Sequence, residues 1–291
     1  MKKMEIKARA KINLGLDITS VRKDGYHNIK TVMQSVGLSD ELTFRKSDEI
    51  SISCDDESLE CGPENIIYRC IEAIRVHADM PDAGLKVVLE KRIPMGAGLG
   101  GGSADGAATL VAFNELYELG YNEETLCRIG LTVGADIPFQ IRGGCALCEG
   151  IGEIITPIET AHEYPCVIVK PDISISTKDA YVVMDQQPIY VRPNFEEIIE
   201  GLKQHNRETI QRGLVNVFEI YAQNLSDEIQ DIKNLMYEQN TVATSMSGSG
   251  SAIFGIFETE EQAQSAYQFL SRIYDKVWLT EFRDASLETE D

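Results

Sequence analysis

The segment from residue 95 to residue 106, MGAGLGGGSADG, constrains the fold of this chain more than any other stretch, because six of its residues are glycine. The residues before it, GLKVVLEKRIP, are typical of a β-strand, and those after it, SADGAATLVAFNELYEL, place apolar side chains at helical spacing. Ser103 is well placed to cap the start of this helix. Loop amides and a helix dipole together bind anions, and glycine lets phosphate oxygens approach the backbone. The sequence therefore predicts a phosphate-binding unit of strand, loop and helix.

Three known nucleotide-binding patterns fit this loop less well. Gly96, Gly98 and Gly101 match the dinucleotide fingerprint G-x-G-x-x-G, but that fold needs an acidic residue at the end of a strand about 20 positions further on. The residues there, ELGYNEET, join two predicted helices instead. A Walker A loop would end in Gly-Lys-Ser/Thr, whereas this one ends at Gly102-Ser103, and the sequence lacks the further motifs of protein kinases. We therefore expect a phosphate site that needs no lysine in the loop.

The net charge of the 291-residue chain limits its partners. With 47 acidic and 27 basic residues it carries a formal charge of −20, which argues against nucleic acid or an anionic membrane as partner. No apolar run approaches the length of about 18 residues that a membrane span needs, and the start, MKKMEIKARAKINL, lacks the features of a signal peptide. We expect a cytoplasmic protein that acts on small molecules as a monomer or homodimer.

Two of the seven cysteines, Cys145 and Cys148, form a lone C-x-x-C pair. Such a pair can serve redox chemistry or supply half of a zinc site, but no second C-x-x-C accompanies it and the four histidines are scattered. We therefore interpret both residues as small apolar members of a buried strand with reduced thiols.

The first half of the chain predicts an α+β domain around the glycine-rich loop. Residues 12–18 alternate between apolar and polar, which predicts a half-buried strand with Lys11 and Asn13 on the same face. A turn at Asp24-Gly25 and a β-rich stretch follow, and ENIIYRCIEAIRVHA then has apolar residues at helical spacing. In GADIPF, Asp136 lies between the end of a predicted helix and a proline, a loop position at which acidic residues are often functional.

The second half predicts a ferredoxin-like α+β sandwich. Its order is a strand at CVIVKP, several helices between residues 178 and 240, two strands around a second glycine-rich turn, a helix at EQAQSAYQFLSRIY and a strand at KVWLTEF. The segment ETAHEYP is the expected joint, so we divide the chain into domains of residues 1–160 and 161–291. The final LETED is expected to be a frayed acidic tail.

Five stretches together resemble the motifs of the GHMP kinases, the small-molecule kinase superfamily that includes galactokinase, homoserine kinase and mevalonate kinase. Within it they resemble the kinases that act on 4-diphosphocytidyl-2-C-methyl-D-erythritol in non-mevalonate isoprenoid synthesis. The resemblance implies a two-domain α+β fold, with an N-terminal domain similar to domain 2 of ribosomal protein S5 and a ferredoxin-like C-terminal domain. The stretches, which follow the family's order between residues 8 and 258, are AKINLGLDITSVRKDGYHNIKTVMQSV, IPMGAGLGGGSADGAATL, GADIPF, STKDAY and MSGSGSAIF.

The resemblance also implies ATP as the phosphoryl donor, with Mg²⁺, and two catalytic residues. Asp136 would accept the proton of the attacking substrate hydroxyl, while Lys11 would keep Asp136 ionised and stabilise charge on the transferring group. The Ser103 hydroxyl would contact Mg²⁺ or a phosphate oxygen, and the turn Gly248-Ser249-Gly250 would pack against the site from the second domain. The residues expected to bind ATP are Asn65, Pro94, Met95, Gly96, Ala97, Gly98, Leu99, Gly100, Gly101, Gly102, Ser103 and Ala104.

For the acceptor, the resemblance implies a pocket for a cytosine base. Tyr26 and Tyr181 would stack on the two faces of the base, and His27 would form a hydrogen bond with it. Asn13 would contact the substrate, and Thr177 would help to hold its phosphate end. Structural roles are the alternative for both tyrosines, in the hairpin core for Tyr26 and in helix packing for Tyr181.

Two rival functions stay open at this point. Another GHMP kinase would take homoserine or mevalonate, but a carboxylate acceptor would favour an arginine-lined pocket, and we associate the segment DGYH with the cytidylyl substrate. A nucleotide-binding sensor without catalysis would share the fold, but it would not need a base such as Asp136 or its partner Lys11. The kinase for the cytidylyl acceptor is therefore the preferred interpretation.

Overall fold

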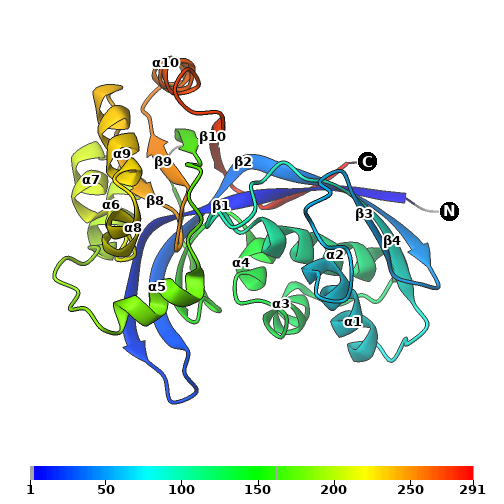
Figure 1. Ribbon diagram of the computed structural model, residues 1–291. Coiled ribbons are helices and arrows are strands. Elements are labelled where there is room, and N and C mark those ends of the chain that lie inside the picture. The colour runs from blue at the N-terminus through cyan, green and yellow to red at the C-terminus, as the bar shows by residue number, and fades with distance from the viewer. Residues whose placement is uncertain (1–2, 161–162, 291) are drawn as a thin grey trace.

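Two long antiparallel strands form the central hairpin of the molecule (Figure 1). They are β1 (Lys3–Val21) and β2 (His27–Ser47), and they are joined by a turn in which Gly25 has a φ of 85°. The computed structural model describes residues 3–160 and 163–290. Because the hairpin runs from one lobe of the molecule to the other, both lobes are built on the same pair of strands.

The other described elements follow the order that the sequence predicts, except for a short helix at Ile137–Arg142 and a last strand at Leu287–Glu290. The strands are β3 (Ser51–Cys54), β4 (Gly84–Glu90), β5 (Cys145–Gly150), β6 (Ile154–Pro157), β7 (Pro165–Val169), β8 (Ala243–Met246), β9 (Ile253–Ile256), β10 (Val277–Arg283) and β11 (Leu287–Glu290). The helices are α1 (Ile66–His77), α2 (Gly101–Tyr117), α3 (Glu123–Leu131), α4 (Ile137–Arg142), α5 (Thr177–Met184), α6 (Phe195–Gln204), α7 (Arg207–Gly213), α8 (Glu219–Leu225), α9 (Glu228–Glu238) and α10 (Glu260–Leu270).

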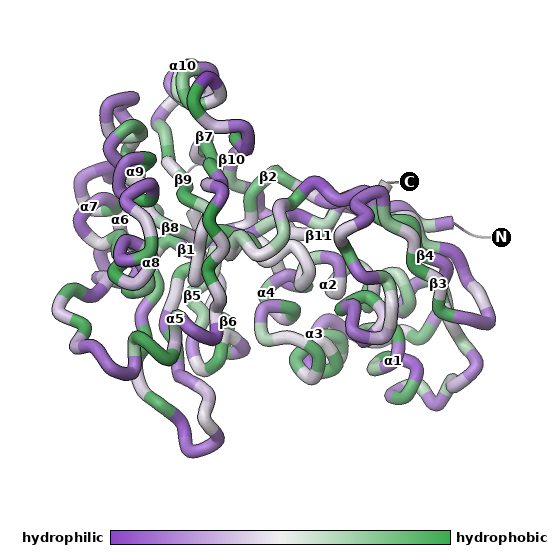
Figure 2. Tube along the Cα trace, viewed as in Figure 1, coloured by the Kyte–Doolittle hydropathy of each residue, from purple (hydrophilic) through white to green (hydrophobic). Residues whose placement is uncertain are grey.

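The described strands belong to one eleven-stranded sheet with the central order β11-β1-β2-β10-β7-β9-β8. Its C-terminal part, β10-β7-β9-β8, is antiparallel throughout, with α5 to α9 between β7 and β8 and α10 between β9 and β10. This is the order of a ferredoxin-like fold, as predicted. All five residues of β7 are buried, and the strand is correspondingly green in Figure 2.

Helices α1 to α4 cover one face of the N-terminal part of the sheet (Figure 1). On α1, the predicted apolar stripe of Ile67, Cys70, Ile71 and Ile74 is fully buried. These side chains share a hydrophobic core with Leu110, Phe113 and Leu116 of α2 and with the inner face of β4. Helical spacing in the sequence thus identified the buried face of α1 correctly, whereas α2 is buried on more sides than its predicted stripe.

Residues 12–18 form part of strand β1, as predicted, but the prediction that this strand is half-buried is wrong. Asn13 and Asp17, on the face predicted to be exposed, are 1% and 7% exposed. The C-terminal lobe covers that face: Leu16 pairs with Asn216, and Asp17 accepts two hydrogen bonds from Arg192 Nη1, at 2.6 and 2.8 Å. Alternation shows which residues share a face, but it does not reveal whether a distant segment covers the polar one.

The predicted frayed tail is also wrong, because LETE forms strand β11 and pairs antiparallel with β1. In this register Leu287 lies opposite Ala8 and Glu288 lies opposite Lys7. Glu288 also forms an ion pair with Arg9. Pairing with a strand more than 270 positions away in the sequence thus orders this segment in spite of its acidic composition.

The C-x-x-C pair lies in β5, as the sequence predicts. Cys145 and Cys148 are buried free thiols, and burial raises the pKa of both, that of Cys148 to about 12. Part of the predicted joint, residues 161–162, lies outside the described residues, and the division at residue 160 stays a prediction. None of the helices in the described ranges is long and apolar enough to cross a membrane.

Candidate active site

The glycine-rich loop connects the end of β4 to the start of α2. The helix begins at Gly101, after Gly100 with a φ of 70°, and no side chain caps it. The prediction that Ser103 is the N-cap is therefore wrong, since Ser103 lies inside the first helical turn. The physical reason is the left-handed conformation of Gly100, which turns the chain into the helix without a capping side chain. The amides of the first turn remain available to an anion.

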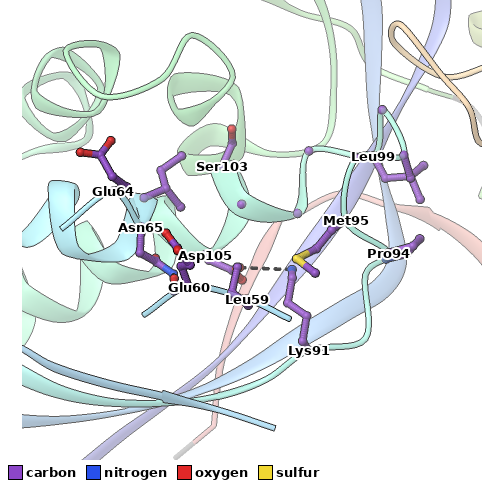
Figure 3. A pocket seen from close by; sticks show the side chains of 17 residues that line it. Leu59, Glu60, Glu64, Asn65, Lys91, Pro94, Met95, Leu99, Ser103 and Asp105 are labelled. Carbon is purple, nitrogen blue, oxygen red and sulfur yellow. Dashed lines mark hydrogen bonds and ion pairs between the residues drawn. The ribbon is translucent and has the colours of Figure 1, made fainter. Parts of the chain in front are cut away.

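A cavity of about 490 Å³ lies against this loop (Figure 3). Every predicted loop residue from Pro94 to Ser103 lines it, but Ala104 is fully buried and does not. The opposite wall is formed by Leu59, Glu60, Glu64 and Asn65, which precede α1, and by Ile66, its first residue. Asn65 lines this wall, but its side chain caps α1 by accepting a hydrogen bond from Ile67 N at 2.9 Å. The cavity has the position that the sequence assigns to ATP.

Sequence reasoning missed a charged cluster beside this cavity. Lys91 lines it, and its ammonium group forms an ion pair of 3.2 Å with Asp105 (Figure 3). A second ion pair joins Lys91 to Asp40. Burial raises the pKa of Asp105 well above its ordinary value, against the effect of the Lys91 charge. Burial lowers the pKa of Lys91, but the two carboxylates outweigh it and the net shift is upward. No sequence motif predicts this cluster, although the position of Lys91 shortly before the phosphate loop could have indicated a charged group beside the site.

A second cavity, of about 250 Å³, shares Gly98 and Gly100 with the first. Five predicted residues from three separate segments surround it. They are Lys11, Asn13, Asp136, Thr177 and Tyr181. Since the two cavities meet at the phosphate loop, a phosphate group on the loop and an acceptor in the second cavity would be neighbours.

The charged pair of this second cavity is formed by Lys11 and Asp136. Lys11 Nζ lies 3.5 Å from Asp136 Oδ2 and donates a hydrogen bond of 2.7 Å to Asn13 Oδ1. The Lys11 side chain is 5% exposed, whereas that of Asp136 is 30% exposed and accessible to a ligand. The Lys11 amide donates to Leu99 O at 2.9 Å, which ties β1 to the phosphate loop. A partly exposed carboxyl group beside a buried lysine suits a general base.

The predicted aromatic pocket is only partly assembled. The rings of His27 and Tyr181 are stacked with centroids 4.5 Å apart, and His27 Nε2 lies 2.7 Å from Asp185 Oδ1. Tyr26 is 64% exposed at the hairpin tip and does not line the cavity. Burial and the charge of Asp136 raise the pKa of Tyr181 to about 12. The structure therefore brings His27 to Tyr181 and leaves Tyr26 apart, and the stacking role of Tyr26 stays a prediction.

The second glycine-rich turn packs against the phosphate loop, as predicted. Ser247 Oγ donates to Gly98 O at 2.9 Å, and Ala252 N donates to Ala97 O at 3.1 Å. Gly248 and Ser249 line the second cavity, where Ser249 Oγ lies 2.8 Å from Thr177 Oγ1. Residues of both lobes thus enclose one continuous site.

Comparison with known proteins agrees with this geometry. Residues 65–144 match the model of the GHMP kinases N terminal domain, and residues 195–276 match that of the GHMP kinases C terminal domain. The 4-diphosphocytidyl-2-C-methyl-D-erythritol kinase of Alkaliphilus metalliredigens is 40% identical over 283 residues, which are 97% of each chain. The protein of the same name from Alkaliphilus oremlandii is 38% identical over 99% of each chain.

Solved structures show the same fold. A crystal structure of 4-(cytidine 5'-diphospho)-2C-methyl-D-erythritol kinase has a TM-score of 0.79 and 32% identity, covering 96% of this chain and 99% of that one. The homoserine kinase of Cytophaga hutchinsonii has a TM-score of 0.80 at 21% identity, covering 100% of this chain and 98% of that one, which shows the fold alone. The chain therefore belongs to the GHMP kinases, and within them to the family of the 4-diphosphocytidyl-2-C-methyl-D-erythritol kinases.

Proposed function

We propose that this protein transfers the γ-phosphoryl group of ATP to the 2-hydroxyl of 4-diphosphocytidyl-2-C-methyl-D-erythritol, a step of isoprenoid precursor synthesis in the cytoplasm. The observation that carries the proposal is the meeting of two cavities at the phosphate loop, with Lys11 and Asp136 on the acceptor side. Free thiols at all seven cysteines, each of them in the described ranges, support a reducing compartment.

In the proposed mechanism, positioning and electrostatics supply most of the rate. The amides of the loop and of the first turn of α2 hold the ATP phosphates. Asp136 accepts the proton of the acceptor hydroxyl as the oxygen attacks, and Lys11 stabilises the charge on the transferring group. The link between Lys11 N and Leu99 O supports this role, because it couples the position of the ammonium group to that of the loop.

Mg²⁺ fits this site as an ion held together with ATP. Within the described ranges, no group of three or more acidic, histidine or cysteine side chains could bind a metal without the nucleotide. Mg²⁺ keeps several waters and takes one or two protein ligands beside the substrate phosphates, and Ser103 in the first turn of α2 would be such a ligand. The ion would supply charge neutralisation at the β- and γ-phosphates.

Two observations favour the cytidylyl acceptor over homoserine and mevalonate: the names of the similar proteins and the aromatic ring of Tyr181 in the acceptor cavity. The relatives that match almost the whole chain are named for this substrate. Tyr181 lines the acceptor cavity and supports recognition of a base, because aromatic rings bind bases by stacking. A homoserine or mevalonate carboxylate would instead favour arginine, and no arginine lines the acceptor cavity in the described part of the chain.

The test is ADP release by the purified protein with Mg²⁺-ATP and each of three acceptors: 4-diphosphocytidyl-2-C-methyl-D-erythritol, homoserine and mevalonate. We expect turnover with the first only, and Asp136→Asn should lower kcat by at least about 100-fold while ATP still binds. Asp172→Asn is the control, since this exposed carboxylate pairs with Lys276 outside both cavities. ATP binding without turnover of any acceptor would favour the sensor instead.

A further inference from the structure

Asn216, between α7 and α8, is a buried amide with no role in the mechanism described above. It is 2% exposed, and its Nδ2 donates to two backbone carbonyls, those of Met246 at 2.7 Å and Gly248 at 2.8 Å. Its Oδ1 accepts a hydrogen bond of 3.0 Å from Phe218 N. Both donors of the amide are therefore committed to the second glycine-rich turn.

The same segment is bound to the strand that carries Lys11. Leu16 N donates to Val215 O and Val217 N donates to Leu16 O, both at 3.0 Å. Asn216 thus lies on a short bridge between β1 and the turn. Any shift of this bridge would change the position of the turn relative to Lys11.

The turn that Asn216 holds lines the second cavity and packs against the phosphate loop, which lines both cavities. A Cβ added to Gly98 would lie 2.0 Å from Ser247 O, so the two backbones are already in close contact. On the acceptor side, Gly248 and Ser249 line the second cavity, and the Ser249 hydroxyl contacts Thr177. The hydrogen bond from Asn216 to the Gly248 carbonyl therefore fixes the part of the turn that lies between the phosphate loop and the acceptor cavity.

A second side chain holds the other end of the turn. Glu219 Oε1 accepts hydrogen bonds from Ser245 Oγ at 2.7 Å and Met246 N at 2.8 Å. Glu219 also forms an ion pair with Lys233 of α9. Residues 216 and 219 together hold residues 245–248, a stretch whose glycine would otherwise allow many conformations.

We propose that Asn216 is a positioning residue for phosphoryl transfer, which holds the turn at residues 247–249 in register with the phosphate loop and the pair of Lys11 and Asp136. The inference rests on the proposed function. Misplacement of reacting groups by about 1 Å can cost about 100-fold in rate, so the loss of this clamp should act on kcat. Nucleotide affinity should change little, because Asn216 does not line the nucleotide cavity.

Asn216→Asp is the test, because it keeps the shape of the side chain and replaces both donors by an oxygen that faces two carbonyls. We expect kcat to fall by about 100-fold while the Kd of ATP stays within about threefold. Asn114→Asp is the matched control. Asn114 is also a buried amide that bridges backbone groups, with bonds of 3.1 and 2.9 Å to Tyr121, and it lies outside both cavities. The control should lose thermal stability but keep kcat within about twofold.

A neutral variant, Asn216→Ser, has a shorter side chain and removes the donated bonds without burying a charge, so its kcat should lie between those of wild type and Asn216→Asp. All rates are normalised to folded protein measured by circular dichroism. The proposal is overturned if normalised kcat is unchanged in a folded variant, if Asn114→Asp lowers kcat equally, or if neither variant at residue 216 folds. Wild-type turnover of the cytidylyl acceptor tests the proposed function separately. If another acceptor or water supports ADP release instead, the ratio of variant to wild type is measured with that one.

Discussion

At the scale of single residues, the side chain of Lys91 lies between two carboxyl groups with unequal surroundings. Asp40 Oδ1 accepts hydrogen bonds from Arg92 N at 2.6 Å and Ile93 N at 2.8 Å, and its other oxygen binds Lys91. Asp105 has Lys91 at one oxygen, and its buried Oδ1 lacks any partner among the described residues. The charge of Asp40 is therefore well compensated, whereas that of Asp105 is not.

This asymmetry predicts a pH-dependent effect of Asp105→Asn on stability. The folded pKa of Asp105 is raised by burial above the unfolded value of about 3.9, so folding loses free energy as the pH rises from there through the folded pKa. Asparagine cannot ionise, and the variant should gain melting temperature relative to wild type between pH 4 and pH 8. Thermal denaturation at both pH values checks this, with Asp172→Asn as an exposed control. An equal loss at both pH values would contradict a raised pKa.

At the scale of elements, the phosphate loop is determined by contacts on both of its sides. Gly98 has a φ of 79° and faces Ser247 O, while Gly100 has a φ of 70° and lies against Lys11 and Gln140. Glycine is required at both positions because the conformation is left-handed and because a Cβ has no room. The loop is therefore a packed part of the interface between the lobes.

Gly98→Ala should consequently lower the free energy of unfolding more than the same change at a left-handed glycine with free space around it. Gly120 has a φ of 67° and nothing within 4 Å of an added Cβ, so Gly120→Ala pays only the conformational cost of about 1 kcal/mol. Gly98→Ala should cost about 2 kcal/mol more through overpacking, and it should also weaken ATP binding. Urea denaturation and nucleotide titration of both variants give the comparison. Equal stability of the two variants would show that the loop can move away from Ser247.

At the scale of the whole molecule, one sheet joins the two lobes, and its last strand returns to its first. β10 pairs with β2 through Phe282 and Arg283 and with β7 through five residues, and the chain then adds β11 to the edge of β1. The C-terminal segment thus spans both parts of the molecule. Its contribution to the free energy of unfolding therefore depends on the whole assembled sheet rather than on either lobe alone.

Removal of residues 287–291 should lower the free energy of unfolding by about 2 kcal/mol, from four lost cross-strand pairs. The expected change in melting temperature is a few degrees. Turnover should be preserved, because neither cavity is lined by a residue of β11. Glu288→Gln removes only the ion pair with Arg9 and should cost less than about 1 kcal/mol. An unchanged melting temperature after truncation would restore the interpretation of a frayed tail.

From the sequence alone it was possible to predict the features that depend on neighbouring residues. The strand, loop and helix around Gly98, the buried stripe of α1 and the ferredoxin-like order of the C-terminal half follow from local spacing. The family motifs also placed Lys11 and Asp136 in one site, and the structure brings them within 3.5 Å. These features depend on residues only a few positions apart in the sequence, which is the range over which periodicity and turn preferences act.

Only the tertiary structure decided which distant segments meet. The burial of Asn13, the strand at residues 287–290, the cluster around Lys91 and the clamp at Asn216 all join residues far apart in the sequence. Local sequence patterns do not reveal such partners, because each of these residue types is also common in surface strands, turns and helix ends. The sequence by itself determined the phosphate loop and its chemistry, and packing of the two lobes decided what surrounds it.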